Sequence, residues 1–219
     1  HDIMVQLQQI EKGNKVIIIL DSIGNLASKK EVEDSIEGKS VADMSRAKQM
    51  KSLFRMVTPS LVAKDIPCVT ICHTYQTMEL YSKAIISGGT GLIYSANQAF
   101  IIGKSQEKDA DGELGGWNFT LNVEKSRYVR EKSKMKFQVL YDSGIQKYSG
   151  LLDLALDTGR VIKPSNGWYS RVDDEGVVED KKWRVKDTNS SEFWDMLLKS
   201  DSFKESVSAN YKLTSGVSQ

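Results

Sequence analysis

The sequence is poor in the residues that build metal sites, disulfide frameworks and sharp chain reversals. Only two cysteines, two histidines and three prolines occur in 219 residues. Cys68 and Cys72 lie four positions apart in an apolar run, so we expect free thiols in a core and no zinc site. No apolar run approaches the roughly 18 residues of a membrane helix. These absences exclude a disulfide-stapled domain and a zinc domain, and we expect no membrane partner.

The two signs of charge are nearly balanced. Thirty Lys and Arg oppose 29 Asp and Glu, a net charge of +1, and 40% of residues are hydrophobic. These values are ordinary for a globular protein and exclude a histone-like chain and an acidic disordered tail. Any surface that binds nucleic acid must therefore be a local cluster of cations.

The apolar pattern of the amino-terminal half predicts alternating helices and strands. We expect helices at residues 2–11 and 40–64, strands at 16–20, 68–72 and 99–102, and loops at 27–39 and 74–91. Ser40 and Asp43 resemble a capping box at the start of the second helix. The first two strands are wholly apolar without alternation, which predicts strands buried on both faces, as in a parallel sheet.

The carboxyl-terminal half has a different pattern. Residues 117–124 and 135–141 alternate between polar and apolar side chains, which is typical of antiparallel strands. Around them we expect a polar loop at 104–116, a helix at 149–159, a hairpin of 168–170 with 182–184, and a helical tail at 191–212. The fold class is therefore α/β, with parallel central strands, then an antiparallel hairpin region and a small terminal α/β extension. We expect a core domain at 1–163 and an extension at 164–219.

Asp21 and His73 directly follow the first two predicted strands. The carboxyl ends of parallel strands are where α/β sheets bind ligands. An aspartate there can hold magnesium or its waters in a nucleotide hydrolase, and a histidine can sense a terminal phosphate. A turn aspartate and a hydrogen-bonded histidine at a strand end are the alternatives.

Cations cluster in two places. Lys48, Lys51 and Arg55 share one face of the predicted helix, either as solvated charges or as a surface that follows phosphates. Residues 121–136 carry six cations and two anions. In this segment Lys125 and Arg127 are expected to leave the same strand face and to reach a neighbouring subunit's phosphate, as an arginine finger does. A solvated hairpin end is the alternative.

The order of several motifs identifies a family. DSIGNLASKKE, SRAKQMKSLFR, ICHTY, GGTG, NVEKSR, GLLDLAL and NGWYS follow one another over most of residues 1–200. In this order they resemble the carboxyl-terminal part of the RecA/RAD51 recombinase core, and its phage T4-type branch in particular. The resemblance implies a RecA-like P-loop ATPase fold. It also implies a protein that uses ATP and Mg²⁺, forms helical filaments on single-stranded DNA and exchanges strands with double-stranded DNA in recombination, replication and repair.

The resemblance also assigns roles to single residues. Asp21 resembles the Walker B aspartate, with Ser22 beside it, and His73 stands where the family has a phosphate-sensing residue, often Gln. Lys125 and Arg127 match paired cations that reach the ATP of the adjacent subunit, and the segment from Tyr141 through Gly144 to Ile145 resembles its adenine cap. Two DNA loops, at about 27–41 and 74–91, flank the helix. The positions matching contacts to DNA are Lys29, Lys30, Lys48, Lys51, Arg55, Lys83, Gly88, Gly89 and Thr90.

The phosphate-loop pattern G-x-x-x-x-G-K-[ST] is absent from the sequence. In the family it precedes the segment that this chain resembles. We therefore expect a partial core that does not hydrolyse ATP alone and exposes an apolar sheet edge. A trimmed sequence and a split gene that needs a partner chain both remain open. So do three other functions: an ATP-independent DNA-binding module, a hexameric helicase and an inactive structural remnant.

The resemblance further implies mediator proteins and single-strand-binding proteins as partners. It places the protein in the cytoplasm of a phage-infected bacterium.

Overall fold

The computed structural model describes residues 2–38, 46–76, 84–86, 91–108 and 112–213. The chain divides into two compact units, residues 1–96 and 97–219. Within the described ranges no helix is long and apolar enough to cross a membrane. The domain boundary expected at residue 163 stays a prediction.

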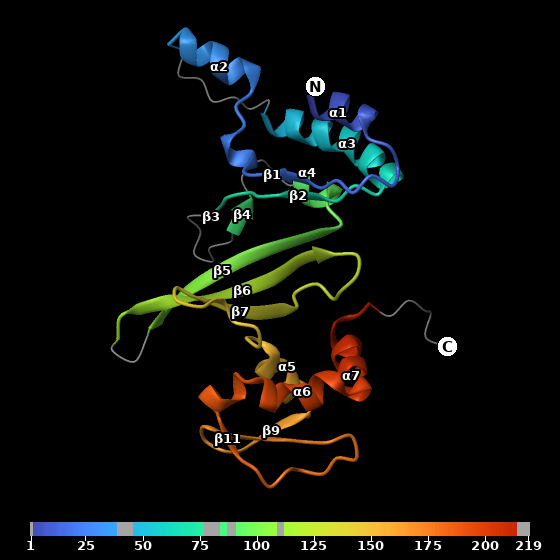
Figure 1. The fold of residues 1–219 in the computed structure, drawn as a ribbon. Coiled ribbons are helices and arrows are strands. Elements are labelled where there is room, and N and C mark those ends of the chain that lie inside the picture. The colour runs from blue at the N-terminus through green and yellow to red at the C-terminus, as the bar shows by residue number, and fades with distance from the viewer. Residues whose placement is uncertain (1, 39–45, 77–83, 87–90, 109–111, 214–219) are drawn as a thin grey trace. The chain divides into compact units, whose positions relative to one another are not determined.

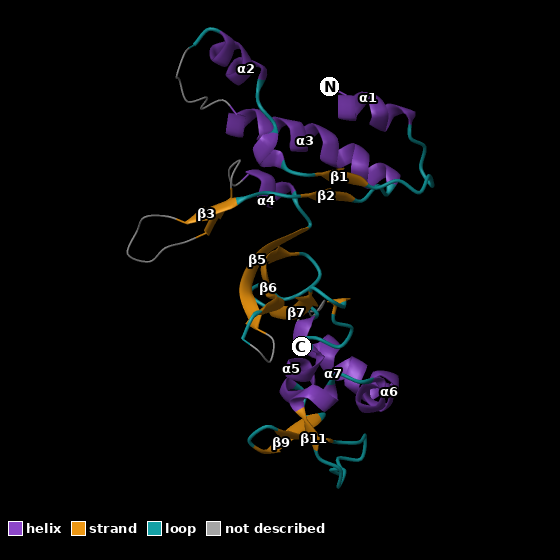
Figure 2. Cartoon of the chain, turned by 60° about the vertical axis from the view of Figure 1, so that its left-hand side comes forward, coloured by secondary structure: helices purple, strands orange, loops and turns teal. Residues whose placement is uncertain are grey.

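Two helices cover one face of a parallel strand pair in the first unit (Figures 1 and 2). Its elements are α1 (Asp2–Gln9), β1 (Ile18–Leu20), a 3₁₀ turn (Ile23–Asn25), α2 (Lys29–Ile36), α3 (Arg46–Lys64), β2 (Cys68–Thr70), β3 (Thr74–Gln76), β4 (Ala84–Ile86) and α4 (Gly91–Ser95). β1 pairs with β2 in register Ile18 to Cys68. Leu7 of α1 and Val57 and Leu61 of α3 pack over the pair, as their helical spacing predicts.

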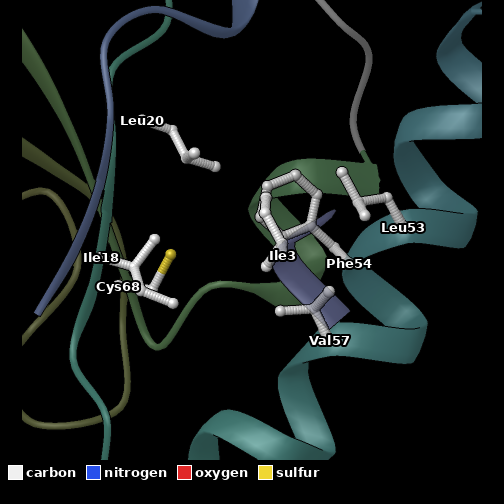
Figure 3. Close-up of a pocket in the computed structure, with 7 residues that line it drawn as sticks. All are labelled: Ile3, Ile18, Leu20, Leu53, Phe54, Val57 and Cys68. Carbon is white, nitrogen blue, oxygen red and sulfur yellow. The ribbon is translucent and has the colours of Figure 1, made fainter. Parts of the chain in front are cut away.

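A cavity of about 10 Å³ lies under α3. Figure 3 shows its lining, in which Ile18, Leu20 and Cys68 from the strands face Phe54 and Val57 of α3. The lining is wholly apolar and the space holds one water at most. It is a packing gap, and the candidate ligand residues lie elsewhere.

Two expectations for the first unit are wrong. Residues 29–36 form helix α2, because Ser28 and Glu31 make a reciprocal capping box that starts it. The expected box of Ser40 and Asp43 lies outside the described residues. Among the described residues of the first unit, the strands are covered on one face only, since the middle residue of both β1 and β2 is exposed.

The region after β2 also differs from expectation. β3 and β4 form an antiparallel pair within the expected loop at 74–91. The strand expected at 99–102 is β5 (Gln98–Lys108), which pairs antiparallel with β6 and continues through most of the expected loop at 104–116. Its outer half is polar and exposed, which is why its composition resembles that of a loop.

The second unit contains two antiparallel sheets and three helices. The larger sheet has the order β5, β6 (Leu114–Ser126), β7 (Lys134–Leu140) and β8 (Gly144–Ile145). The other elements are α5 (Leu151–Asp157), β9 (Val161–Ser165), β10 (Trp168–Arg171), β11 (Trp183–Arg184), a 3₁₀ turn (Val185–Thr188), α6 (Ser191–Lys199) and α7 (Asp201–Tyr211). α5 and α6 lie between the larger sheet and the β9–β11 sheet (Figures 1 and 2). The predicted antiparallel strands, α5 and the terminal hairpin are confirmed, and the tail is two helices.

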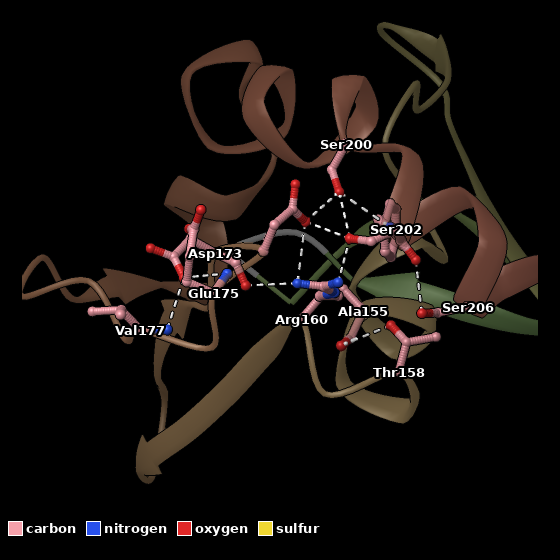
Figure 4. A network of polar contacts seen from close by, with 11 residues as sticks. Ala155, Thr158, Arg160, Asp173, Glu175, Val177, Ser200, Ser202 and Ser206 are labelled. Carbon is pink, nitrogen blue, oxygen red and sulfur yellow. Dashed lines mark hydrogen bonds and ion pairs between the residues drawn. The ribbon is translucent and has the colours of Figure 1, made fainter.

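An aromatic core and a polar network around Arg160 hold the second unit together. Phe193 and Trp194 of α6 are fully buried against Trp183. In Figure 4, Arg160 joins the Asp173 carbonyl to Ser202 at the start of α7. Hydrogen bonds from Ser202 and Ser200, and the charge of Arg160, lower the pKa of Asp174.

Both cysteines are free, as expected. Burial raises the pKa of the Cys72 thiol. The thiol therefore stays protonated, and it packs at the edge of the cluster around Ile23.

Candidate nucleotide and DNA sites

Asp21 and Ser22 lie at the carboxyl end of β1. The backbone pairing with β2 continues past the strand, since Ile71 N–H donates to Leu20 O and Ile23 N–H donates to Ile71 O, each at 2.9 Å. Residues 21–23 therefore run beside residues 71–73, where His73 lies. Asp21 and His73 are exposed, whereas Ser22 is 5% exposed.

Gly24 separates Ser22 from His73. A Cβ atom placed on Gly24 would lie 3.2 Å from His73 Cδ2 and 3.7 Å from Ser22 Oγ. Both side chains therefore approach the same point of the backbone. The absence of a side chain at Gly24 allows this approach.

The oxygen atoms of Asp21 and Ser22 suit a magnesium ion. Ser22 Oγ is buried and has no hydrogen-bond partner in the described part of the chain, which is unusual for a buried hydroxyl. The Asp21 carboxylate beside it is exposed. No cluster of three acidic, histidine or cysteine side chains occurs among the residues described. Water and phosphate oxygens would supply the remaining ligands, as is usual for magnesium.

Arg46 contacts this loop, and the sequence alone did not single it out. Its Nη2 atom donates hydrogen bonds to Ile23 O at 2.9 Å and Gly24 O at 2.8 Å. The partners are backbone carbonyls more than twenty positions away in the sequence. No residue-type pattern could have indicated the contact.

Lys48, Lys51 and Arg55 are all exposed, on the face of α3 opposite Phe54 and Val57. A Cβ atom on Gly91 would lie 3.1 Å from Lys51 Cβ and Cγ, so the Lys51 stem packs on the first turn of α4. The stem is thereby fixed while its ammonium group extends into solvent.

The other expected DNA contacts fall on α2 or outside the described residues. Lys29 and Lys30 are exposed at the start of α2, where Lys29 forms an exposed ion pair with Glu33 at 3.6 Å. Such a pair is weak and does not prevent Lys29 from meeting a phosphate. The positions that lie outside the described residues are Lys83, Gly88, Gly89 and Thr90.

Lys125 and Arg127 lie in the second unit. Lys125 is half-buried in β6, whereas Arg127 is exposed beyond the strand end. The Ser126 hydroxyl accepts hydrogen bonds from Tyr128 N–H and Val129 N–H, at 3.0 and 3.1 Å. This turn directs the chain away from the strand. Arg127 N–H still donates to Asn97 O at 3.1 Å, so the pairing with the β5 end reaches one residue past β6. That both cations leave one face of the strand stays a prediction.

The end of α7 holds the loop that follows Arg127. Arg130 N–H donates to Tyr211 O at 2.8 Å, and Leu213 N–H donates to Tyr128 O at 3.4 Å. Val129 and Lys212 form an antiparallel bridge between these bonds.

Tyr141 and Gly144 lie where the chain turns from β7 into β8. Tyr141 is exposed and its hydroxyl accepts a hydrogen bond from Trp117 Nε1 at 3.0 Å. Gly144 has a φ of +68°, a value that favours glycine. The segment therefore presents an oriented aromatic ring and an exposed Ile145.

Comparison with known proteins supports a recombinase ancestry. Residues 148–207 match the family model of the bacteriophage T4 recombination and repair protein, C-terminal domain. The recombination and repair protein of Enterobacteria phage T4 is 54% identical over 217 residues, which are 97% of this chain and 55% of that protein.

The RecA proteins are more distant relatives. RecA of Chlorobaculum tepidum is 29% identical over 164 residues, 74% of this chain and 46% of that protein. RecA of Tropheryma whipplei is 27% identical over 161 residues, 73% of this chain and 36% of that protein. The chain thus spans about half the length, or less, of these curated relatives. It belongs to the RecA-related recombinase family, in the group that includes the phage T4 recombination and repair protein.

Proposed function

We propose that this chain acts in an ATP-dependent recombinase that forms filaments on single-stranded DNA and exchanges strands with double-stranded DNA. The observation that carries the proposal is the buried Ser22 hydroxyl, which has no hydrogen-bond partner among the residues that the structure describes and lies beside Asp21 at the end of a parallel strand. It occurs in a chain 54% identical to a recombination and repair protein. Such a protein works in the cytoplasm of an infected bacterium, beside mediator and single-strand-binding proteins.

The first unit supplies metal and phosphate contacts in this proposal. Asp21 and Ser22 hold magnesium, which neutralises charge on the phosphates of ATP when both are bound. His73 donates a hydrogen bond to the terminal phosphate. The P-loop ATPase core is completed by a phosphate loop, whose pattern is absent from this sequence. We therefore expect the chain alone not to hydrolyse ATP.

The second unit supplies the contacts to the next subunit. Lys125 and Arg127 stabilise negative charge on the phosphates of the neighbouring subunit's nucleotide, as an arginine finger does. The segment from Tyr141 to Ile145 covers its base. In this arrangement each nucleotide is held by two subunits, which links filament assembly to ATP.

DNA is held through its backbone. Lys48, Lys51 and Arg55 contact phosphates, with Lys29 and Lys30 on α2 and the glycine-rich segment before α4. Phosphate contacts carry no sequence information. The bases remain available for pairing with another strand, so we expect binding without sequence preference.

The test uses a chimaera in which this chain replaces the segment that it matches in the T4 protein. We expect Lys125→Ala with Arg127→Ala to abolish DNA-stimulated ATP hydrolysis and to leave DNA binding within about twofold. The control is Arg130→Ala with Lys134→Ala, two further cations of the same segment. Unchanged hydrolysis in the first variant would contradict the proposed role of Lys125 and Arg127.

An ATP-independent DNA-binding module is the second candidate. The exposed cations of α3 favour it, since they lie within this chain while the phosphate-loop pattern is absent. Anisotropy of labelled single-stranded DNA, with and without ATP, separates the two functions. Replacing one phosphate-binding cation by alanine should lower the slope of log affinity against log salt by about 0.7. Binding by the chain alone, indifferent to ATP, would favour the module.

A further inference from the structure

One apolar cluster joins the candidate metal loop to the candidate DNA helix. Ile23, directly after Ser22, is fully buried against Phe54 of α3 and Leu92 of α4. Gly24 lies against His73, and Gly91 lies against the Lys51 stem. The loop, both helices and His73 therefore pack as one cluster, in which a displacement of one part is transmitted to the others.

Arg46 adds the polar link in this cluster. It is the first residue of α3, two positions before Lys48. One of its terminal nitrogens donates to two consecutive loop carbonyls, those of Ile23 and Gly24. Its Nε atom is buried and has no hydrogen-bond partner among the described residues, so the loop carbonyls are the contacts that fix the guanidinium.

Hydrogen bonds from a charged donor are stronger than neutral ones. They are also directional, which apolar packing is not. Ile23 packing alone would let the loop slide over α3, whereas two carbonyls bound to one nitrogen fix its register. Ser22 directly precedes the first of these carbonyls, so its hydroxyl is positioned through Arg46.

We propose that Arg46 is a positioning residue that locks the loop of Ser22, Ile23 and Gly24 to α3, so that DNA on α3 and the metal–nucleotide at Asp21 and Ser22 strengthen each other's binding. The inference rests on the proposed function and adds a coupling residue to it. Coupling of two binding sites is reciprocal, so each ligand must raise the affinity of the other by the same factor.

The test uses the T4 chimaera and measures the factor by which each ligand raises the affinity of the other. Anisotropy gives the affinity for labelled oligo-dT with and without magnesium and a non-hydrolysable ATP analogue. A fluorescent ATP analogue gives nucleotide affinity with and without oligo-dT. We expect Arg46→Gln to lower both factors at least fivefold toward one, while DNA affinity without nucleotide changes less than twofold. Arg46→Lys, which keeps the charge but loses the planar fork, should lie between.

The matched control is Lys12→Gln, which removes an exposed cation of the same unit that pairs with Asp65 at 3.7 Å. It should leave both factors unchanged. An alternative result is that Arg46→Gln lowers the affinities for DNA and for nucleotide while each ligand still raises the affinity of the other by the wild-type factor. That result would show that Arg46 only supports the fold and would overturn the inference. Unchanged coupling factors in a folded Arg46→Gln variant would also overturn it. If the Arg46→Gln variant unfolds at a lower temperature than the wild type, the same comparison is made with Arg46→Lys. Absence of coupling in the wild-type chimaera would contradict the proposed function itself.

Discussion

Gly150, at the start of α5, occupies a backbone position that no other residue fits. Its φ is +79°, and a Cβ atom there would lie 2.1 Å from the Lys136 carbonyl oxygen of β7. Both the dihedral angle and the close approach require glycine. This residue therefore lets α5 begin directly against the larger sheet.

We expect Gly150→Ala to lower the free energy of unfolding by about 3 kcal/mol, because the backbone must shift to relieve the contact. Gly159→Ala is the control, since Gly159 has a φ of +70° but no described atom within 4 Å of its Cβ position. It should cost only about 1 kcal/mol. Urea unfolding of both variants gives the comparison, and equal losses would contradict the steric argument.

Glu179 is held by a dense set of donors. Arg171 bonds to both carboxylate oxygens, at 2.6 to 3.0 Å, and Trp183 Nε1 donates at 2.8 Å. The Arg171 and Glu179 side chains are 15% and 19% exposed. Burial alone would raise the pKa of Glu179, but the bonds from Arg171 and Trp183 outweigh it and lower the pKa below its ordinary 4.5.

A carboxylate with a lowered pKa stabilises the fold above its unfolded pKa, and this stability is lost as the pH falls through the folded pKa. We therefore expect Glu179→Gln to cost about 2 kcal/mol at pH 7, and progressively less below pH 4.5. The control is Asp201→Asn, in an exposed pair with Lys204, with an expected cost near zero. A pH-independent loss in Glu179→Gln would refute the assignment.

Strand ends and helical spacing predicted that Asp21 follows a strand and that the α3 cations share an exposed face, as the structure has them. The roles of these residues stay predictions, and His73 lies three positions past the end of β2. The sequence did not indicate the burial of Ser22 or the contact of Arg46. Both depend on backbone groups brought close by the fold, and backbone carbonyls leave no residue-type signature. The turn at Ser126 is different, because it is a local contact of a serine hydroxyl with the N–H groups two and three positions on. Serine at this position was the available signal.

At the scale of elements, apolar periodicity predicted α1, α3, α5, β6 and β7. It missed α2, which has no buried residue and therefore no apolar face to detect. The cap Ser-x-x-Glu at residues 28–31 was the available signal. The outer part of β5 was missed because paired polar residues stabilise a hairpin through backbone bonds rather than through burial.

The bridge between the α7 end and the 128–130 loop yields a prediction at this scale. Ending the chain after Ala209 removes the carbonyl of Tyr211 that receives the Arg130 N–H. We expect hydrogen exchange of the Arg130 amide to accelerate at least tenfold, because an exposed amide exchanges freely. Ending the chain after Leu213 keeps every bond of the bridge and should leave exchange unchanged. Equal exchange in both shortened chains would mean that the bridge does not hold the loop.

At the scale of the whole molecule, the parallel strand pair explains the wrong prediction of strands buried on both faces. Ile19 and Val69 are paired across β1 and β2 and are 60% and 48% exposed, and Ile17 and Ile71 extend the same face. The apolar side chains at these positions predict that this face is buried. Within the first unit the described residues cover only the opposite face, so burial on both faces does not hold there.

An uncovered apolar face of this kind promotes association. We expect this chain to bind the dye ANS and to sediment with a concentration-dependent mass. Ile19→Thr with Val69→Thr should at least halve the dye fluorescence and reduce association, because the hydroxyl replaces apolar surface on that face while Thr keeps the strand propensity. Ile36→Thr with Val185→Thr, at exposed positions elsewhere, should change neither. If the wild-type chain is monomeric and does not bind the dye, another part of the chain covers the strand pair in solution, which would contradict the prediction.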